Sequence, residues 1–163
     1  MTDITVDVTS LLVEVPASTT LDALETALAA RGLTLGVELE VAGPGGAVGT
    51  WLARGAPGAP SLFADPADHL VAGLLATLTN GARLEVRPGP RRAVGPDLTA
   101  LATGTNGRFL SIERAWLRVH RREARRQSLP LPEGVHLDPP VTPEEARLLD
   151  AIERELRVKR SES

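Results

Sequence analysis

VEVPASTTLDALETALAARGLTL, residues 13–35, carries the clearest structural pattern in the chain. Its start continues an alternation of apolar and polar side chains that predicts a strand over residues 11–15. Apolar residues then recur at helical spacing behind Thr19 and Thr20, and either threonine can cap a helix that runs to Arg31. A strand followed directly by an amphipathic helix is therefore predicted in this part of the chain.

The sequence on either side of this stretch indicates short strands and glycine-rich turns. Gly32 ends the helix, because glycine accepts the left-handed backbone found after many helices. Asn80-Gly81 separates two apolar runs and predicts a two-residue hairpin turn with positive φ at both residues. The other predicted elements are strands over residues 4–8, 33–41, 70–79, 82–86 and 109–120 (the last with one irregularity), a helical turn near Trp51, and a short helix over residues 98–102 capped by Asp97.

The C-terminal part of the chain is predicted to be a separate arm. Residues 123–141 form a proline-rich linker, and residues 142–160 form a helix that opens with Thr, Pro and Glu at its N-cap, N1 and N3 positions. An isolated helix of this length is marginal in water, so its apolar stripe needs a covering surface. That surface is either this chain's own sheet or a partner protein, and the stiff linker favours the partner. The predicted docking residues are Leu148, Leu149, Ile152 and Leu156.

Together these elements predict an α+β fold, with a mostly antiparallel sheet, flanking short helices and the C-terminal helix on its linker. A net charge of −3 and only two Trp, two Phe and no Tyr argue against a nucleic-acid partner. The arginines of residues 114–126 are interpreted as a solvated or partner-docking face. No apolar run is long enough to span a bilayer, and the N-terminus has no signal-peptide pattern. We therefore expect no membrane insertion and a cytoplasmic location.

No pattern for catalysis or metal binding is recognisable. The chain has no cysteine, and its three histidines are scattered without metal-ligand spacing. A nucleophile elbow, a Walker A loop and a Rossmann glycine motif are all missing from the sequence, so we predict no catalytic residue and no metal site. The informative feature is three glycine-rich turns at residues 43–49, 55–58 and 104–107. They are either ordinary surface turns or loops that let a ligand approach the backbone.

Four segments, taken in order, carry a family resemblance. They are VEVPASTTLDALETALAARGLTL, AVGTWLARGAPG (residues 47–58), ADHLVAGLLATLTNGARLEV (67–86) and VGPDLTALATGTNGRFLSIERAWLRVHR (94–121). They resemble the second lobe of the FAD-binding domain (type 4, or PCMH type) of FAD-linked oxidases, as in glycolate oxidase subunits, D-lactate dehydrogenases and alkylglycerone-phosphate synthase. The resemblance implies a truncated FAD-binding-like domain over residues 1–122.

The resemblance also implies a flavin site that is incomplete. In this family the loop that wraps the FAD pyrophosphate belongs to the first lobe, and a further segment forms the substrate-binding cap. Neither is expected in this sequence. Thr50 and Leu110 also stand where the family has glycine, and Asn106 where it often has Glu or Tyr, so FAD binding by this chain alone is not expected. The residues implied to face FAD are Val48, Gly49, Thr50, Gly58, Gly104, Thr105, Asn106, Gly107 and Ile112.

Three functions stay open at this point. The first is a small subunit or partner of a flavin-dependent oxidoreductase, similar to 2-hydroxy-acid oxidases and not catalytic alone. The second is a flavin-free scaffold or interaction subunit of a larger complex, and the third is a stand-alone flavin-binding protein. The family resemblance favours the first, and the changes at flavin-facing positions favour the second. The third is the least consistent with the sequence, because the pyrophosphate loop is not expected.

Overall fold

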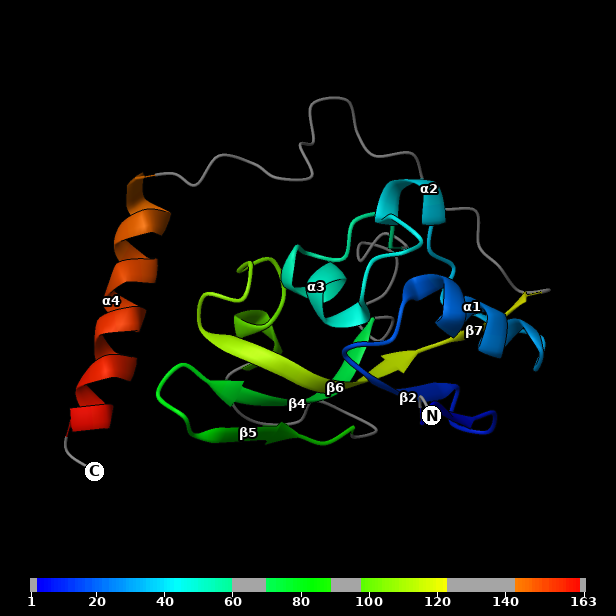
Figure 1. The fold of residues 1–163 in the computed structure, drawn as a ribbon, viewed down its shortest axis with the longest axis horizontal. Coiled ribbons are helices and arrows are strands. Elements are labelled where there is room, and N and C mark those ends of the chain that lie inside the picture. The colour runs from blue at the N-terminus through cyan, green and yellow to red at the C-terminus, as the bar shows by residue number, and fades with distance from the viewer. Residues whose placement is uncertain (1–2, 60–69, 89–97, 123–142, 162–163) are drawn as a thin grey trace.

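The computed structural model describes residues 3–59, 70–88, 98–122 and 143–161, and one antiparallel sheet forms its centre (Figure 1). Five strands form this sheet in the order β1-β2-β6-β4-β5: β1 (Thr5–Asp7), β2 (Leu12–Pro16), β4 (Val71–Leu78), β5 (Arg83–Val86) and β6 (Leu110–Arg118). The short strands β3 (Leu33–Thr34) and β7 (His120–Arg121) pair with each other. The helices are α1 (Leu21–Ala29), α2 (Leu39–Ala42), α3 (Val48–Ala53), the 3-10 helix η2 (Leu98–Leu101) and α4 (Pro143–Ser161). The predicted α+β fold is confirmed.

Some of the sequence-based predictions cannot be compared with this structure. The proline-rich linker over residues 123–141 lies outside the described residues, and so do the predicted helix caps Asp97 and Thr142. The helix predicted after the linker is α4, which begins at Pro143. Proline suits this first position because it has no N–H to leave unpaired there.

Strand β6 organises the sheet although it comes late in the sequence. It pairs with β2 on one side and with β4 on the other, both antiparallel. The irregularity predicted for this strand is a bulge in its pairing with β4, where Leu75 pairs with Arg114 and Ala76 pairs with Ile112, so that Glu113 is the extra residue. After β6 the chain passes through Val119 before β7 begins. The Val119 N–H donates to the Leu11 carbonyl at 3.0 Å, so the chain stays attached to β2 while it turns toward β3.

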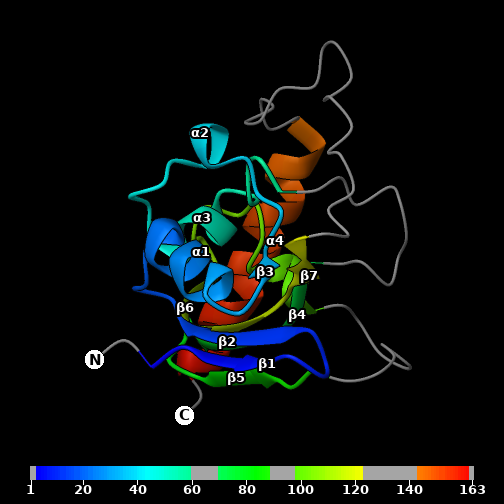
Figure 2. The same ribbon diagram turned by 90° about the vertical axis from the view of Figure 1, so that its right-hand side faces the viewer.

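The helices α1 and α3 cover one face of this sheet (Figure 2). Leu21, Leu24 and Leu28 of α1 have no exposed surface, and they belong to one core cluster with inward-facing residues of the strands. Burying each such leucine contributes about 1.5–3 kcal/mol relative to leaving it in water. The residues of the five-stranded sheet in this cluster are Val13, Val15, Val71, Leu74, Ala76, Leu110, Ala115 and Leu117.

Helix α1 is capped at its start by Thr20, one of the two predicted threonines. The Thr20 Oγ1 accepts a hydrogen bond from the Ala23 N–H at 3.3 Å, while the backbone of Thr20 is extended. This geometry satisfies one of the N–H groups that a helix start leaves unpaired. Thr19 is buried instead, at 3% exposure.

The strand predicted over residues 33–41 is wrong beyond Thr34. The Glu25 carboxylate of α1 accepts hydrogen bonds from the Leu35 N–H, at 2.7 Å, and from the Thr34 hydroxyl. An N–H bound to a side chain is no longer available to a neighbouring strand. Gly36 then turns the chain with a φ of 74°, and Leu39–Ala42 form the one-turn helix α2.

The β4–β5 hairpin is confirmed, but its turn differs from the predicted two-residue type. Of the two turn residues only Gly81 has a positive φ, at 85°. The Leu78 carbonyl accepts from the Gly81 N–H, and the Leu78 N–H donates to the Ala82 carbonyl, each at 2.8 Å. This is a three-residue turn closed by a left-handed glycine. The Asn80 side chain accepts from the Ala82 N–H at 2.9 Å, which stabilises the alternative turn.

Candidate functional site

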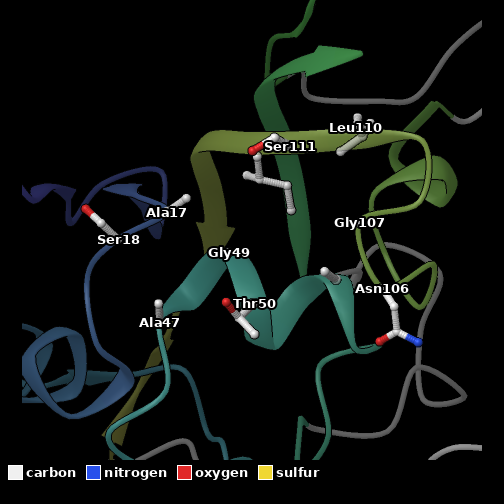
Figure 3. Close-up of a pocket in the computed structure, with 11 residues that line it drawn as sticks. Ala17, Ser18, Ala47, Gly49, Thr50, Asn106, Gly107, Leu110 and Ser111 are labelled. Carbon is white, nitrogen blue, oxygen red and sulfur yellow. The ribbon is translucent and has the colours of Figure 1, made fainter. Parts of the chain in front are cut away.

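A hollow of about 450 Å³ lies between α3 and the beginning of β6 (Figure 3). Three segments distant in sequence form it: the connection after β2, helix α3, and the turn that leads into β6. The described residues that line it are Ala17, Ser18, Ala47, Gly49, Thr50, Ala53, Asn106, Gly107, Leu110, Ser111 and Ile112. All of these lining side chains are uncharged, and most of them are small.

The first turn of α3 holds one wall of the hollow. The Val48 N–H donates to the Thr19 carbonyl and the Gly49 N–H donates to the Ala17 carbonyl, each at 2.8 Å. These two N–H groups at the start of a helix would otherwise be free to bind a ligand. Because carbonyls of the connection after β2 accept these two hydrogen bonds, the two N–H groups are not available to a ligand.

Gly49 allows the close contact at this wall. It belongs to α3, and its φ is not in the left-handed region. A Cβ built at this position would lie 2.8 Å from the Cβ of Ala17, which is closer than side-chain carbons approach in proteins. Glycine is therefore needed here for the close packing of α3 against Ala17, and not for a special backbone angle.

The last turn of α3 holds the opposite wall. The Gly104 N–H donates to the Leu52 carbonyl at 3.3 Å, and the Asn106 N–H donates to the Ala53 carbonyl at 2.8 Å. Gly104, Asn106 and Gly107 all have left-handed backbones, with φ values of 76°, 52° and 75°. Glycine takes this conformation freely and Asn tolerates it better than most residues, which explains the composition of the turn. The two walls are thus attached to opposite ends of one short helix.

Five of the nine predicted flavin-facing residues line the hollow: Gly49, Thr50, Asn106, Gly107 and Ile112. The other four lie elsewhere. The Val48 side chain is fully buried in the core, and Gly58 packs against the Glu38 carbonyl. Gly104 and Thr105 belong to the same turn as Asn106 but do not line the hollow, and the Thr105 hydroxyl donates to the Leu101 carbonyl at 2.9 Å.

Sequence reasoning missed the wall contributed by Ala17 and Ser18, and also Ala47, Ala53, Leu110 and Ser111. Small residues directly after a predicted strand are the one signal that could have indicated Ala17 and Ser18. Leu110 is 3% exposed and belongs to the core cluster, so it forms the floor of the hollow as well as part of the interior.

Four polar side chains around the hollow are available to a ligand. Ser18, Thr50, Asn106 and Ser111 are all exposed. Within the described part of the chain, the hydrogen bonds of the protein do not use these side chains. Three hydroxyls and one amide can donate to and accept from a neutral, polar ligand.

One charged residue next to the hollow is Arg108, which directly follows Gly107, and its charge is already paired. Its guanidinium donates to Asp150, at 2.5 Å, and to Glu153, both of α4. The hydrogen bond to Glu153 is the main reason that the pKa of Arg108 is raised above its usual value, so the side chain is a permanent cation. This cation is directed to α4 and is not among the residues that line the hollow.

Neither a metal centre nor a membrane span is found in the regions that the structure describes. Residues 3–59, 70–88, 98–122 and 143–161 contain no group of three His, Asp or Glu side chains that could hold an ion. The same regions contain no helix with the length and apolar character needed to cross a membrane. The prediction that the chain has no metal site stays a prediction.

The sequence profile of the FAD binding domain family matches residues 1–87, which is more than half of the chain. The chain therefore belongs to this family, the FAD-binding domains of FAD-linked oxidases, and the resemblance found in the sequence is confirmed. The match ends before the turn at residues 104–107, so it covers the α3 side of the hollow and not the opposite wall.

Solved structures agree with this assignment at the level of fold. Alkyldihydroxyacetonephosphate synthase in two crystal forms matches with TM-scores of 0.60 and 0.59 at 20% sequence identity. Each match covers 74% of this chain and 22% of the synthase chain, so the protein spans about a fifth of the length of these relatives. No curated protein sequence matches the chain.

Proposed function

We propose that this FAD-binding domain is a small subunit or partner of a flavin-dependent oxidoreductase, similar to 2-hydroxy-acid oxidases, and that it is not catalytic alone. The observation that carries the proposal is the uncharged hollow at residues of an FAD-binding family. In this proposal the hollow is one wall of a flavin site, and a partner polypeptide supplies the others.

The lining suits one part of FAD better than another. Glycine and alanine let a planar ring approach the backbone of α3, and Thr50, Asn106 and Ser111 offer neutral hydrogen-bonding groups to its edge. The FAD pyrophosphate instead carries two negative charges, which need cations or several free N–H groups. Among the described lining residues there is no Lys or Arg, and the N–H groups of Val48 and Gly49 already donate to backbone carbonyls. We therefore infer that the hollow takes the flavin ring and that the phosphates are bound elsewhere.

The lining also explains why we expect no catalysis by this chain alone. A bound flavin supplies hydride and electron transfer. Oxidation of a hydroxy acid additionally needs a group that removes the hydroxyl proton, typically His, Glu, Asp, Lys or Tyr. None of the described residues around the hollow is of these types. The partner would therefore supply the base and the binding site for the substrate carboxylate.

The partner contact that we propose is the apolar stripe of α4. Leu148 is 62% exposed, and Leu149 and Ile152 are half-buried without belonging to the core cluster. The side chain of Leu156, the fourth predicted docking residue, lies outside the described part of the structure. An amphipathic helix of this kind fits an apolar groove on a second protein.

A flavin-free scaffold is the second candidate, and one observation favours it. The Thr50 side chain stands at the hollow where the family has glycine, so part of the space for a ring is already occupied. In that case the fold would survive as a support for α4, and the hollow would bind no cofactor.

Flavin titration distinguishes these functions. We expect the purified chain to lose FAD during gel filtration, and to bind riboflavin and FAD with dissociation constants within about threefold of each other, because the hollow does not recognise phosphate. Fluorescence quenching measures both affinities. Thr50→Phe should abolish binding by filling the hollow, whereas Thr26→Phe, at an exposed position of α1, should not.

The other outcomes are equally informative. FAD that co-elutes with the monomer in a 1:1 ratio would contradict the proposed need for a partner. A chain that quenches neither riboflavin nor FAD, even in the presence of its partner, would support the scaffold.

A further inference from the structure

Arg108 connects the hollow to the C-terminal helix. It follows Gly107 directly in sequence, and Gly107 lines the hollow. On its other side the guanidinium contacts Asp150 through Nη2, at 2.5 Å, and Glu153 through Nε. Asp150 and Glu153 are three residues apart, so they lie on the same face of α4. One cation therefore joins two adjacent turns of the helix to the turn that precedes β6.

The main chain around Arg108 is held firmly on the body of the protein. The Arg108 N–H donates to the Thr105 carbonyl at 3.0 Å, and the Phe109 carbonyl accepts from the Thr79 N–H at the end of β4 at 2.9 Å. The Phe109 side chain is 1% exposed, and its ring centroid is 6.0 Å from the Arg108 guanidinium carbon. The main chain of Arg108 is thus anchored just before β6, and its side chain joins this anchored segment to α4.

The two residues before Arg108, Asn106 and Gly107, form fewer hydrogen bonds to the rest of the protein. Asn106 and Gly107 are exposed, and the Asn106 N–H bond to the Ala53 carbonyl attaches them to α3. Both residues have left-handed backbones, which an unconstrained Asn adopts only at a conformational cost. The conformation of such a turn depends on the residues on either side of it, and Arg108 is the neighbouring residue nearest to α4.

We propose that Arg108 is a positioning residue, through which the docking of α4 holds the Asn106–Gly107 wall of the flavin hollow in place. Release of α4 would loosen this wall, and an ordered wall would favour docking of α4, because such coupling is reciprocal. The role of the wall in flavin binding rests on the proposed function, whereas the coupling between α4 and the wall does not.

Amide hydrogen exchange on the full chain tests the coupling without any ligand. The double variant Asp150→Asn, Glu153→Gln removes both carboxylate charges from α4 and leaves the wall untouched. We expect exchange to become about three- to tenfold faster in α4 and also at the Asn106 amide, which donates to the Ala53 carbonyl, the range set by the modest strength of exposed ion pairs. Salt at 1 M should have a similar effect on the wild type, because it screens exposed charges.

Matched controls separate positioning from a general loss of stability. Glu155→Gln removes an exposed carboxylate of α4 that the Arg108 contact does not use, and Arg87→Gln breaks the ion pair between Arg87 and Glu85 on β5. Both controls should leave exchange at the Asn106 amide unchanged. The core amide of Leu117 should keep its wild-type rate in every variant. Arg108→Glu combined with Asp150→Lys and Glu153→Lys restores opposite charges and should slow exchange at the wall again.

A second measurement links the coupling to the flavin. The Asp150→Asn, Glu153→Gln variant should bind riboflavin about two- to fivefold more weakly than the wild type, in proportion to the loosened wall. If the wild type binds no flavin even in the presence of its partner, the proposed function fails and the exchange experiment still tests the coupling. Faster exchange in α4 with an unchanged rate at the Asn106 amide would overturn the coupling. An unchanged rate in α4 itself would overturn the role of Arg108 in docking.

Discussion

The contact between Gly49 and Ala17 sets the width of the hollow at one wall. Gly49 is half-buried in α3, and its N–H donates to the Ala17 carbonyl. Two opposing effects act on a side chain at this position. Alanine is favoured over glycine in a helix by about 1 kcal/mol, whereas forcing an extra carbon into a packed contact costs about 1–3 kcal/mol.

We predict that the contact outweighs the helix propensity. Gly49→Ala should lower the free energy of unfolding by about 1 kcal/mol, because the new Cβ meets Ala17. In the double variant Ala17→Gly, Gly49→Ala the obstructing methyl group is gone, so part of the lost stability should return. Urea denaturation of both single variants and the double variant measures the coupling. Additive effects of the two substitutions would show that Ala17 is not the obstacle.

At the scale of elements, the start of α1 contains two threonines with different roles. Thr20 caps the helix, whereas the Thr19 hydroxyl is buried and has no hydrogen-bond partner among the described residues. A buried hydroxyl without a partner destabilises the folded state, because it has lost its hydrogen bonds to water and has not replaced them. The two neighbours should therefore respond oppositely to loss of the hydroxyl.

Substitution of each threonine tests this expectation. Thr20→Ala should destabilise the protein by about 1 kcal/mol through loss of the cap. Thr19→Val keeps the shape of the side chain and removes the unpaired hydroxyl, so it should be neutral or stabilising by up to about 1 kcal/mol. Thermal unfolding followed by circular dichroism compares the two variants. A large loss of stability in Thr19→Val would reveal a hydrogen bond that the structure does not contain.

Elements were predicted well wherever the pattern is local. The periodicity of Leu21, Leu24 and Leu28 predicted α1, and the alternation around Val13 predicted β2, because each follows from the geometry of a single element. The strand predicted over residues 33–41 failed for the opposite reason. Its end depends on Glu25, a side chain of the preceding helix that takes the Leu35 N–H. Sequence periodicity contains no information about such a contact.

At the scale of the whole molecule, the structure leaves α4 outside the hydrophobic core. None of its described apolar residues belongs to the core cluster, and its contacts to Arg108 are ion pairs near the surface. The stability of the body should therefore depend little on α4. This distinguishes a docking arm from a helix that completes the core.

Truncation tests that distinction. A chain that ends before Pro143 should melt within about 5 °C of the full chain, because exposed ion pairs contribute little to stability. It should no longer co-purify with its partner. Leu28→Ala in the full chain serves as the comparison, since a leucine removed from the core costs about 2–5 kcal/mol. Aggregation or unfolding of the truncated chain would mean that α4 belongs to the core after all.

The candidate site was only partly predictable. Glycine-rich turns and the family resemblance pointed to Gly49, Asn106 and Gly107, which do line the hollow. The same reasoning also selected Val48 and Gly58, whose surroundings are internal. A glycine looks the same in sequence whether it makes room for a ligand, for another segment of the chain or for a left-handed turn. Only its neighbours in space distinguish these roles.

Local order in this protein, with its helix caps, apolar stripes and turn glycines, could be read from the residues because backbone geometry imposes short periods on them. The placement of β6 between β2 and β4 could not, since it depends on pairing with β4 and also with β2, which lies about 100 residues earlier in the chain. The hollow could not be read from the residues either, because its walls come from three segments that are distant in sequence. These segments meet only when each end of α3 forms hydrogen bonds with one of the other two. Pairing and packing of this kind are chosen by the burial of the whole core, a quantity that no single stretch of sequence contains.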